Sequence, residues 1–313
     1  MKRKALLLLV AALLLLAACT PAAPAPTATP AHTQEAAAAT PVPTIDTAPK
    51  FSFEEYPLVD GSTANLPLMA AVLSRVTGME QSDAEAHTAC TTTPGAYESL
   101  VNGTADLLLV YEAAEETKEM IENSGVGLDL IPIGRDALVF IVNESNSVEG
   151  LTISQLTDIY TGKTANWKSL GGADSEIAAF QRSSDSGSQA LFMKLLMKGK
   201  TPMQAPMEFY PTEMGELIED LAEYNGSGNA IGYSVYYYAN YMYSKPGLKF
   251  LAINGVAPSD ESIASGEYPF INEFYAVVRS DEPADSPARQ IAQWLATPDG
   301  KALITDAGYV STP

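Results

Sequence analysis

Residues 137–142 read Ala-Leu-Val-Phe-Ile-Val, an unbroken apolar run near the middle of the chain. Such a run is typical of a strand that is buried on both faces of a sheet. Similar runs cover 107–111 and 274–278, and a helical pattern follows at 153–160. Strands that alternate with helices predict α/β lobes with mainly parallel sheets. The other expected strands are 177–180 and 250–253, and the other expected helices are 66–76, 96–101, 188–197, 214–224 and 286–295.

The N-terminal segment has the features of an export signal. Positive charges lie in residues 1–4, an apolar run covers 6–16, and Ala17-Ala18-Cys19 closes the segment. This order predicts a signal peptide over residues 1–18, since the 14 apolar residues at 5–18 are fewer than the roughly 20 that a membrane span needs. Residues 16–19, Leu-Ala-Ala-Cys, resemble the bacterial lipobox, which implies that Cys19 is lipidated. An ordinary secretory signal with an unrelated cysteine is the alternative.

Residues 19–50 are rich in Pro, Ala and Thr, so we expect a disordered tether between the lipidated cysteine and the globular part. Residues 51–313 have the composition of a folded body of one large domain or two lobes. Loss of residues 1–18 removes three basic residues and no acid, which takes the formal charge from −20 to −23. This acidity argues against nucleic acid as a partner and against electrostatic docking on anionic lipid.

Cysteine and histidine are scarce. Cys90 is the only cysteine after Cys19, and His32 and His87 are the only histidines. No disulfide framework and no zinc-site spacing follow from so few residues. We therefore expect no metal, no cofactor and no enzymatic activity.

Three segments share one design, in which a Ser/Thr/Gly turn opens into an amphipathic helix. They are 60–63 (Asp-Gly-Ser-Thr), 91–93 (Thr-Thr-Thr, with Pro94 expected at the first helical position) and 182–188 (Arg-Ser-Ser-Asp-Ser-Gly-Ser). Helix N-termini carry unpaired N–H groups and a partial positive charge. Small residues let an oxyanion approach that backbone, and hydroxyls add donors. Each turn alone is most simply a helix cap, but three turns and an arginine together indicate anion capture.

From Val59 to the C-terminus the sequence resembles the phosphate-binding components of bacterial ABC importers. The marks are the first turn at 60–63, the segment 133–143, the block 151–167 with Ile159-Tyr160-Thr161-Gly162-Lys163, the turn 182–188, and the closing segments 294–300 and 308–310. The resemblance implies a two-lobed periplasmic-binding-protein-like α/β fold (type II), with two crossing strands as a hinge and the ligand between the lobes. Lobe one would comprise 51–136 and 269–313, and lobe two 137–268.

The resemblance also implies the ligand contacts. Carried over position by position, they are Ser62, Thr63, one of Thr92 and Thr93, Arg182, Ser186, Gly187 and Ser188. Ser188 stands where the family usually has Thr, which keeps the hydroxyl. Glu112 stands where the family has an Asp that accepts the proton of bound phosphate, so we assign that role to Glu112, with Asp60 as the next candidate. A solvated Glu112 beside Glu115 and Glu116 is the alternative.

The expected function is extracytoplasmic capture of inorganic phosphate and its delivery to an ABC permease and its ATPase, by a monomer that touches the membrane only through its lipid anchor. Other oxyanions (sulfate, molybdate), a small phosphorylated compound, and a sensor or adhesin on the same fold are the alternatives. A phosphate-ester hydrolase lacks an evident base. The tyrosines 233, 236, 237, 238, 241 and 243 have the spacing of a packed helical face rather than of a sugar-stacking site.

Overall fold

A computed structural model describes residues 46–184, 186–211, 213–224 and 227–313. The expected signal peptide, Cys19 and the tether up to residue 45 lie outside the described residues, as does Asp185 of the third turn. In the described ranges, no helix is both long and apolar enough to cross a membrane. The same ranges contain no group of three or more His, Cys, Asp or Glu that is suited to a metal ion.

The centre of the folded unit is an eight-stranded sheet with the order β1-β2-β9-β3-β6-β5, and β10 and β7 also pair with β3. The two longest strands of the sheet are β3 (Leu128–Asn143) and β9 (Ile271–Arg279), which pair with each other in its middle. Residues 128–137 of β3 pair with β9, and residues 138–143 pair with β6 and β7. The remaining strands are β1 (Val59–Gly61), β2 (Leu107–Tyr111), β4 (Gly150–Leu151), β5 (Ala178–Ala179), β6 (Ala230–Val235), β7 (Leu248–Phe250), β8 (Ala252–Ile253) and β10 (Val310–Ser311).

The expectation of mainly parallel sheets is wrong. Among the described strands, β1–β2, β5–β6 and β4–β8 are parallel, whereas every pairing of β3 and β9 is antiparallel. The reason is that β9 returns beside β3 in the opposite direction, and each of them also pairs with further strands. The apolar run 137–142 is thus the second half of a long strand that changes partners near its middle.

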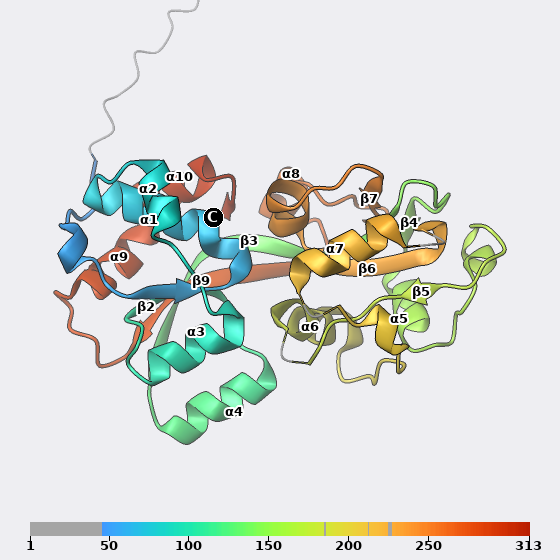
Figure 1. The fold of residues 1–313 in the computed structure, drawn as a ribbon, viewed down its shortest axis with the longest axis horizontal. Helices are drawn as coiled ribbons and strands as arrows, with labels where there is room; N and C mark the ends of the chain where they lie inside the picture. Colours follow the sequence, from blue (N-terminus) through green and yellow to red (C-terminus); the bar gives the residue numbers. More distant parts are fainter. Residues whose placement is uncertain (1–45, 185, 212, 225–226) are drawn as a thin grey trace, which may run out of the picture. The chain divides into compact units, whose positions relative to one another are not determined.

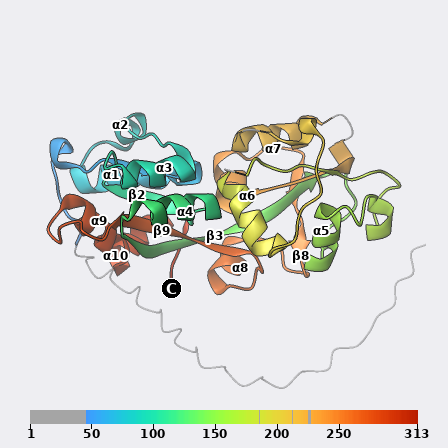
Figure 2. The same cartoon turned by 90° about the horizontal axis from the view of Figure 1, so that it is seen from below.

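The helices lie on both sides of these strands (Figures 1 and 2). One group surrounds β1 and β2, and the other surrounds β6. The first comprises α1 (Leu66–Thr77), α2 (Gln81–Ala86), α3 (Thr92–Val101), α4 (Glu115–Ser124), α9 (Pro287–Leu295) and α10 (Pro298–Asp306). The second comprises α5 (Ile153–Tyr160), α6 (Gly187–Phe192), α7 (Met214–Glu223) and α8 (Asp260–Ser265), and a π-helical turn Met193–Met197 continues α6.

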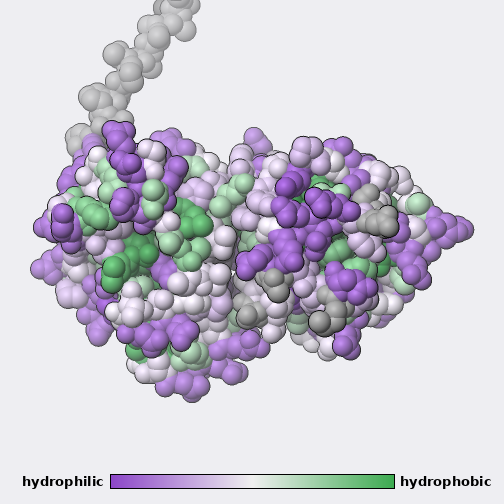
Figure 3. All heavy atoms as spheres, in the orientation of Figure 1, coloured by the Kyte–Doolittle hydropathy of each residue, from purple (hydrophilic) through white to green (hydrophobic). Residues whose placement is uncertain are grey.

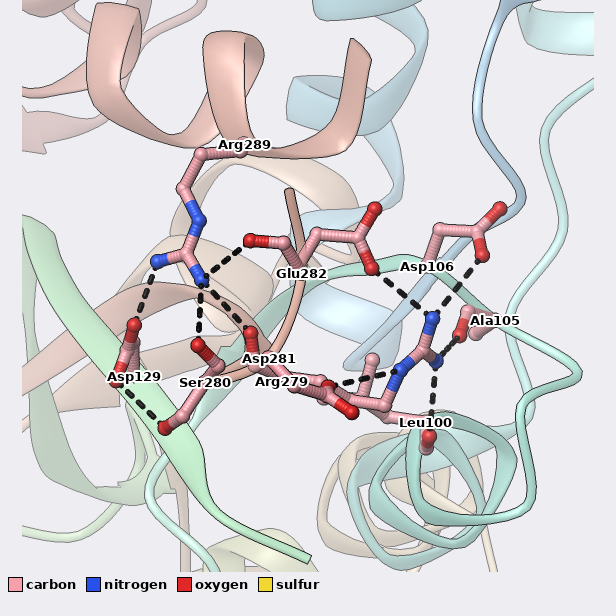
Figure 4. A network of polar contacts seen from close by, with 9 residues as sticks. All are labelled: Leu100, Ala105, Asp106, Asp129, Arg279, Ser280, Asp281, Glu282 and Arg289. Atoms are coloured by element: carbon pink, nitrogen blue, oxygen red, sulfur yellow. Dashed lines mark hydrogen bonds and ion pairs between the residues drawn. The ribbon is translucent and has the colours of Figure 1, made fainter. Parts of the chain in front are cut away.

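Two arginines fasten the end of β9 to the elements around it (Figure 4). The guanidinium of Arg279 donates to the carbonyls of Leu100 and Ala105 and pairs with Glu282 at 3.0 Å. Arg289, on α9, pairs with Asp129 at the start of β3. Because these contacts join β3, β9, α3 and α9, the first half of the sheet is held at its outer end by polar as well as apolar contacts.

The folded part begins a few residues earlier than expected. The backbone N–H and the hydroxyl of Thr47 both donate to Asp299 on α10 at 3.1 Å. Arg75 pairs with Asp299 and with Asp46, and Ala48 is buried. Residues 46–50, which we assigned to the tether, are therefore packed against α1 and α10.

Candidate anion-binding site

The three predicted turns meet at one cavity of about 550 Å³. They come from separate parts of the chain, since the first follows β1, the second opens α3 and the third opens α6. The predicted contacts that line the cavity are Ser62, Thr63, Thr92, Thr93, Arg182, Ser186, Gly187 and Ser188.

Asp60 fixes the first turn against the second. Its carboxylate accepts from the backbone N–H groups of Gly61 (2.7 Å) and Thr91 (2.8 Å), and from the Thr91 hydroxyl (2.6 Å). Gly61 has no room for a side chain, because a Cβ there would stand 2.2 Å from the carbonyl oxygen of Leu109. Asp60 is buried and does not line the cavity. The structure therefore places Asp60 as a brace between two turns and not as a group that faces the ligand.

Ser62 and Thr93 join the first two turns from the cavity side. Their hydroxyl oxygens are 2.8 Å apart, and the backbone N–H of Tyr111 donates to the Ser62 hydroxyl at 3.1 Å. The helix α3 begins at Thr92, two residues before Pro94, so Pro94 is not its first residue. Thr92 has φ 72°, in the left-handed region that a β-branched residue rarely adopts. Backbone strain of this kind is concentrated at binding sites.

The third turn places Arg182 and the N-terminus of α6 at the cavity. Arg182 is buried, and its Nε donates to the carbonyl of Pro211 at 3.1 Å. Ser186 caps α6 by accepting from the Gln189 N–H, and its hydroxyl oxygen is 3.0 Å from that of Ser188. The third turn thus supplies a guanidinium, hydroxyls and helix-terminal N–H groups together.

Gly187 brings the second and third turns into contact. A Cβ at this position would stand 2.8 Å from the Thr93 hydroxyl oxygen, which is closer than real Cβ atoms come. The starts of α3 and α6 therefore approach each other directly. Two helix N-termini that converge on one cavity both favour negative charge there.

Glu112 is not brought into this cavity. Its carboxylate pairs with Lys118 at 2.9 Å and with Lys194, and it lines a separate hollow of about 620 Å³. Burial pushes the pKa of Glu112 upward, but the hydrogen bonds from Lys194 and Lys118 outweigh burial and hold that pKa below its ordinary value. The geometry thus corrects the expectation that Glu112 faces the ligand, because two lysines draw its side chain to the other side of α6.

Residues that we did not predict complete the cavity. Tyr111 lies beside Ser62, and Val235, Tyr238 and Tyr243 follow from the end of β6. The first turns of α7 supply Glu213, Met214, Gly215, Glu216 and Glu219. Hydrophilic residues gather over α7 in Figure 3. The tyrosine-rich run was the one visible signal in the sequence, and we assigned all of it to packing.

Tyr111 also links the cavity to the long strand β3. Its hydroxyl donates to the carboxylate of Asp136 at 2.6 Å. The same carboxylate accepts from the backbone N–H groups of Ala137 (2.7 Å) and Tyr237 (3.1 Å). Asp136 is buried, and burial raises its pKa to about 6. A single carboxylate therefore connects β2, β3 and the segment that follows β6.

Comparison with known proteins shows the family to which this chain belongs. A family model described as the PBP superfamily domain matches residues 28–299 of this chain. The chain therefore belongs to the PBP superfamily. It is 30% identical over 170 residues to the phosphate-binding protein PstS of Bacillus subtilis (strain 168), an alignment that covers 54% of this chain and spans only 53% of that relative. It is 25% identical over 264 residues to PstS of Borreliella burgdorferi, with 82% of this chain and 90% of the relative covered.

Solved structures share the fold. An ABC-type phosphate transport receptor from Vibrio cholerae aligns with a TM-score of 0.59 at 23% identity, over 81% of this chain and 99% of that one. A protein from Clostridium perfringens, provisionally described as a phosphate ABC transporter substrate-binding protein and solved with bound phosphate, aligns with a TM-score of 0.61 at 20% identity. That alignment covers 82% of this chain and all of the other.

Proposed function

We propose that this chain is an extracytoplasmic solute-binding receptor that captures inorganic phosphate and delivers it to an ABC permease and its ATPase. One observation carries the proposal: three donor-rich turns and a buried arginine, from separate parts of the chain, line one cavity. The names of the relatives from B. subtilis and B. burgdorferi point to the same ligand.

Affinity has to come from these local donors. The expected mature charge of −23 repels an anion at long range, but a Debye length of about 8 Å at physiological salt screens most of that repulsion. Hydrogen bonds to a charged group contribute roughly 1.5–3 kcal/mol each. Several of them on one phosphate are enough for micromolar or tighter binding.

The proposal includes an organisation for the whole chain. Residues 1–18 form a signal peptide, Cys19 carries the lipid anchor, and a tether leads to the folded part. Residues 51–136 and 269–313 form lobe one, and residues 137–268 form lobe two. The receptor acts as a monomer without enzymatic activity. The helix α3 belongs to proposed lobe one and α6 to proposed lobe two, and the N-termini of both helices line the same cavity, which supports this division.

A less selective oxyanion receptor is the second candidate. We expected phosphate to be preferred over sulfate because a carboxylate can accept the proton of phosphate. Glu112 does not line the cavity, and the carboxylates that do, on α7, belong to residues that are exposed or half-buried. This placement removes the original basis for selectivity, so sulfate and molybdate have to be compared directly with phosphate.

Isothermal titration of residues 46–313 tests the proposal. Wild type should bind phosphate more tightly than sulfate or molybdate. Arg182→Ala should weaken phosphate binding by about 2–5 kcal/mol, the range for loss of one partner of a buried charge pair. Arg135→Ala is the control, since Arg135 lies outside the cavity and donates to the carbonyl of Ala264. Equal affinity of Arg182→Ala and wild type would contradict the assigned site, and preference for sulfate would favour the second candidate.

A further inference from the structure

Tyr238 lines the same cavity as the Ser/Thr turns of β1 and α3. It begins the π-helical turn Tyr238–Met242 that follows β6, and it lines the cavity together with Arg182. Only 7% of the residue is exposed. The ring is therefore largely enclosed by the protein, and its hydroxyl oxygen lies beside Gly215, another residue of the cavity wall.

The ring has little freedom to turn away. It stacks on Tyr243, with the ring centroids 5.7 Å apart and the planes 11° from parallel. Tyr243 is itself held, because its hydroxyl donates to Glu219 and Lys245 lies over its ring. A stacked, buried ring loses little further entropy when its hydroxyl binds a ligand, which favours binding through preorganisation.

The Tyr238 hydroxyl has no hydrogen-bond partner among the residues that the structure describes. The neighbouring tyrosines differ, since Tyr237 donates to the carbonyl of Ala307, Tyr243 to Glu219 and Tyr233 to Gln189. The Tyr238 oxygen is not among the fully buried unpaired side-chain atoms of the described residues, so it stays accessible to solvent or to a ligand. A ligand in the cavity can therefore supply a partner for this hydroxyl.

The surroundings of this hydroxyl suit an anion that also carries a proton. A Cβ on Gly215 would stand 3.1 Å from the hydroxyl oxygen, so the glycine at the start of α7 leaves space beside it. Burial raises the pKa of Tyr238, Arg182 lowers it and Glu213 raises it, so the hydroxyl lies within the influence of both charges. A neutral hydroxyl can donate to one phosphate oxygen or accept from a protonated one.

We propose that Tyr238 is a ligand-binding residue whose hydroxyl hydrogen-bonds to phosphate held by the three turns. This inference rests on the proposed function. It adds a contact from lobe two, beyond Arg182 and the start of α6, at a position that we had assigned to packing alone. Together these contacts would surround the anion from the turns of β1, α3 and α6 and from the turn after β6.

Tyr238→Phe, which removes only the hydroxyl, is the direct test. Tyr241→Phe is the matched control in the same π-helical turn, since the Tyr241 hydroxyl donates to Asp260 and Tyr241 does not line the cavity. Titration with inorganic phosphate should show about tenfold weaker binding for Tyr238→Phe, as expected for loss of one hydrogen bond to a charged group. Binding by Tyr241→Phe should stay within about twofold of wild type. The melting temperature without phosphate separates a packing role from a ligand role, since a ligand contact changes only the phosphate-induced increase.

Gly215→Ala gives a second arm that does not remove the tyrosine. Its methyl group would press on the Tyr238 hydroxyl, so it should also weaken phosphate binding, while alanine suits a helix better than glycine. If wild type binds phosphate, Arg182→Ala loses it, and both Tyr238→Phe and Gly215→Ala keep it, the role of Tyr238 is refuted and the site stands. If wild type does not bind phosphate, the proposed function itself is refuted.

Discussion

Lys118 and Lys194 decide where the Glu112 side chain points. Lys118 lies one turn into α4 and Lys194 lies in the π-helical turn after α6, and both nitrogens contact the same carboxylate. Such pairs at a partly exposed position typically contribute up to about 1 kcal/mol. That is enough to favour the rotamer of Glu112 that points toward these two lysines.

Glu112→Gln should therefore leave anion binding almost unchanged. The carboxylate lies outside the cavity, so we expect the dissociation constant of phosphate to stay within about twofold of wild type and sulfate binding not to improve. Titrations with both anions measure this, with Arg182→Ala as the variant that should fail. Loss of phosphate together with gain of sulfate would instead restore Glu112 as the proton acceptor.

For single residues, the sequence predicted which residue types line the cavity better than it predicted where each side chain points. Ser62, Thr93, Arg182 and Gly187 were identifiable because turn chemistry at a helix start constrains the backbone locally. The direction of Glu112 was not, since it depends on a lysine 82 positions away. The same holds for Tyr238, whose spacing indicates packing and whose hydroxyl position depends on α7.

Among the elements, β3 carries an unusual group for a buried strand. Asp136 is 2% exposed, and its carboxylate is held by Tyr111 and by the N–H groups of Ala137 and Tyr237. Burial is the largest influence on this group, and it raises the pKa from 3.8 to about 6. The folded protein therefore holds this proton more tightly than the unfolded chain does.

The sign of the pH effect follows from that shift. The contribution of Asp136 to stability is fully present below about pH 4 and is lost as the pH rises through about 6, by about 3 kcal/mol in total. Asp136→Asn removes the titration, so the variant should gain in unfolding free energy relative to wild type between pH 4 and pH 7. Urea unfolding at several pH values measures the difference, and a difference that is independent of pH would contradict the shift.

The element pattern was predictable where one local signal dominated. Ser286 caps α9 before Pro287, and Thr152 opens α5 with a capping box, as local rules favour. The direction of strand pairing was not predictable in this way. Alternation of strands and helices indicated parallel sheets, but β9 returns beside β3 after all of β4 to β8, and no local pattern encodes that return.

On the scale of the whole molecule, the pairing of β9 with β3 joins segments that lie far apart in the sequence. Leu128 pairs with Arg279 and Ala137 pairs with Ile271, and Arg289 then secures Asp129. A chain that is made from its N-terminus has β3 long before β9 and α9 exist. Because pairing over such separations is slow, the first half of the sheet has to wait for nearly the complete chain.

This delay has a consequence for biosynthesis. A polypeptide that crosses a membrane through a narrow channel has to remain unfolded until it emerges, and premature folding would block its passage. In this chain β3 and β9 can pair along their full length only after Arg279 of the 313 residues has been synthesised. If the chain is exported as we propose, the late position of β9 in the sequence would help to keep it unfolded until it has crossed the membrane.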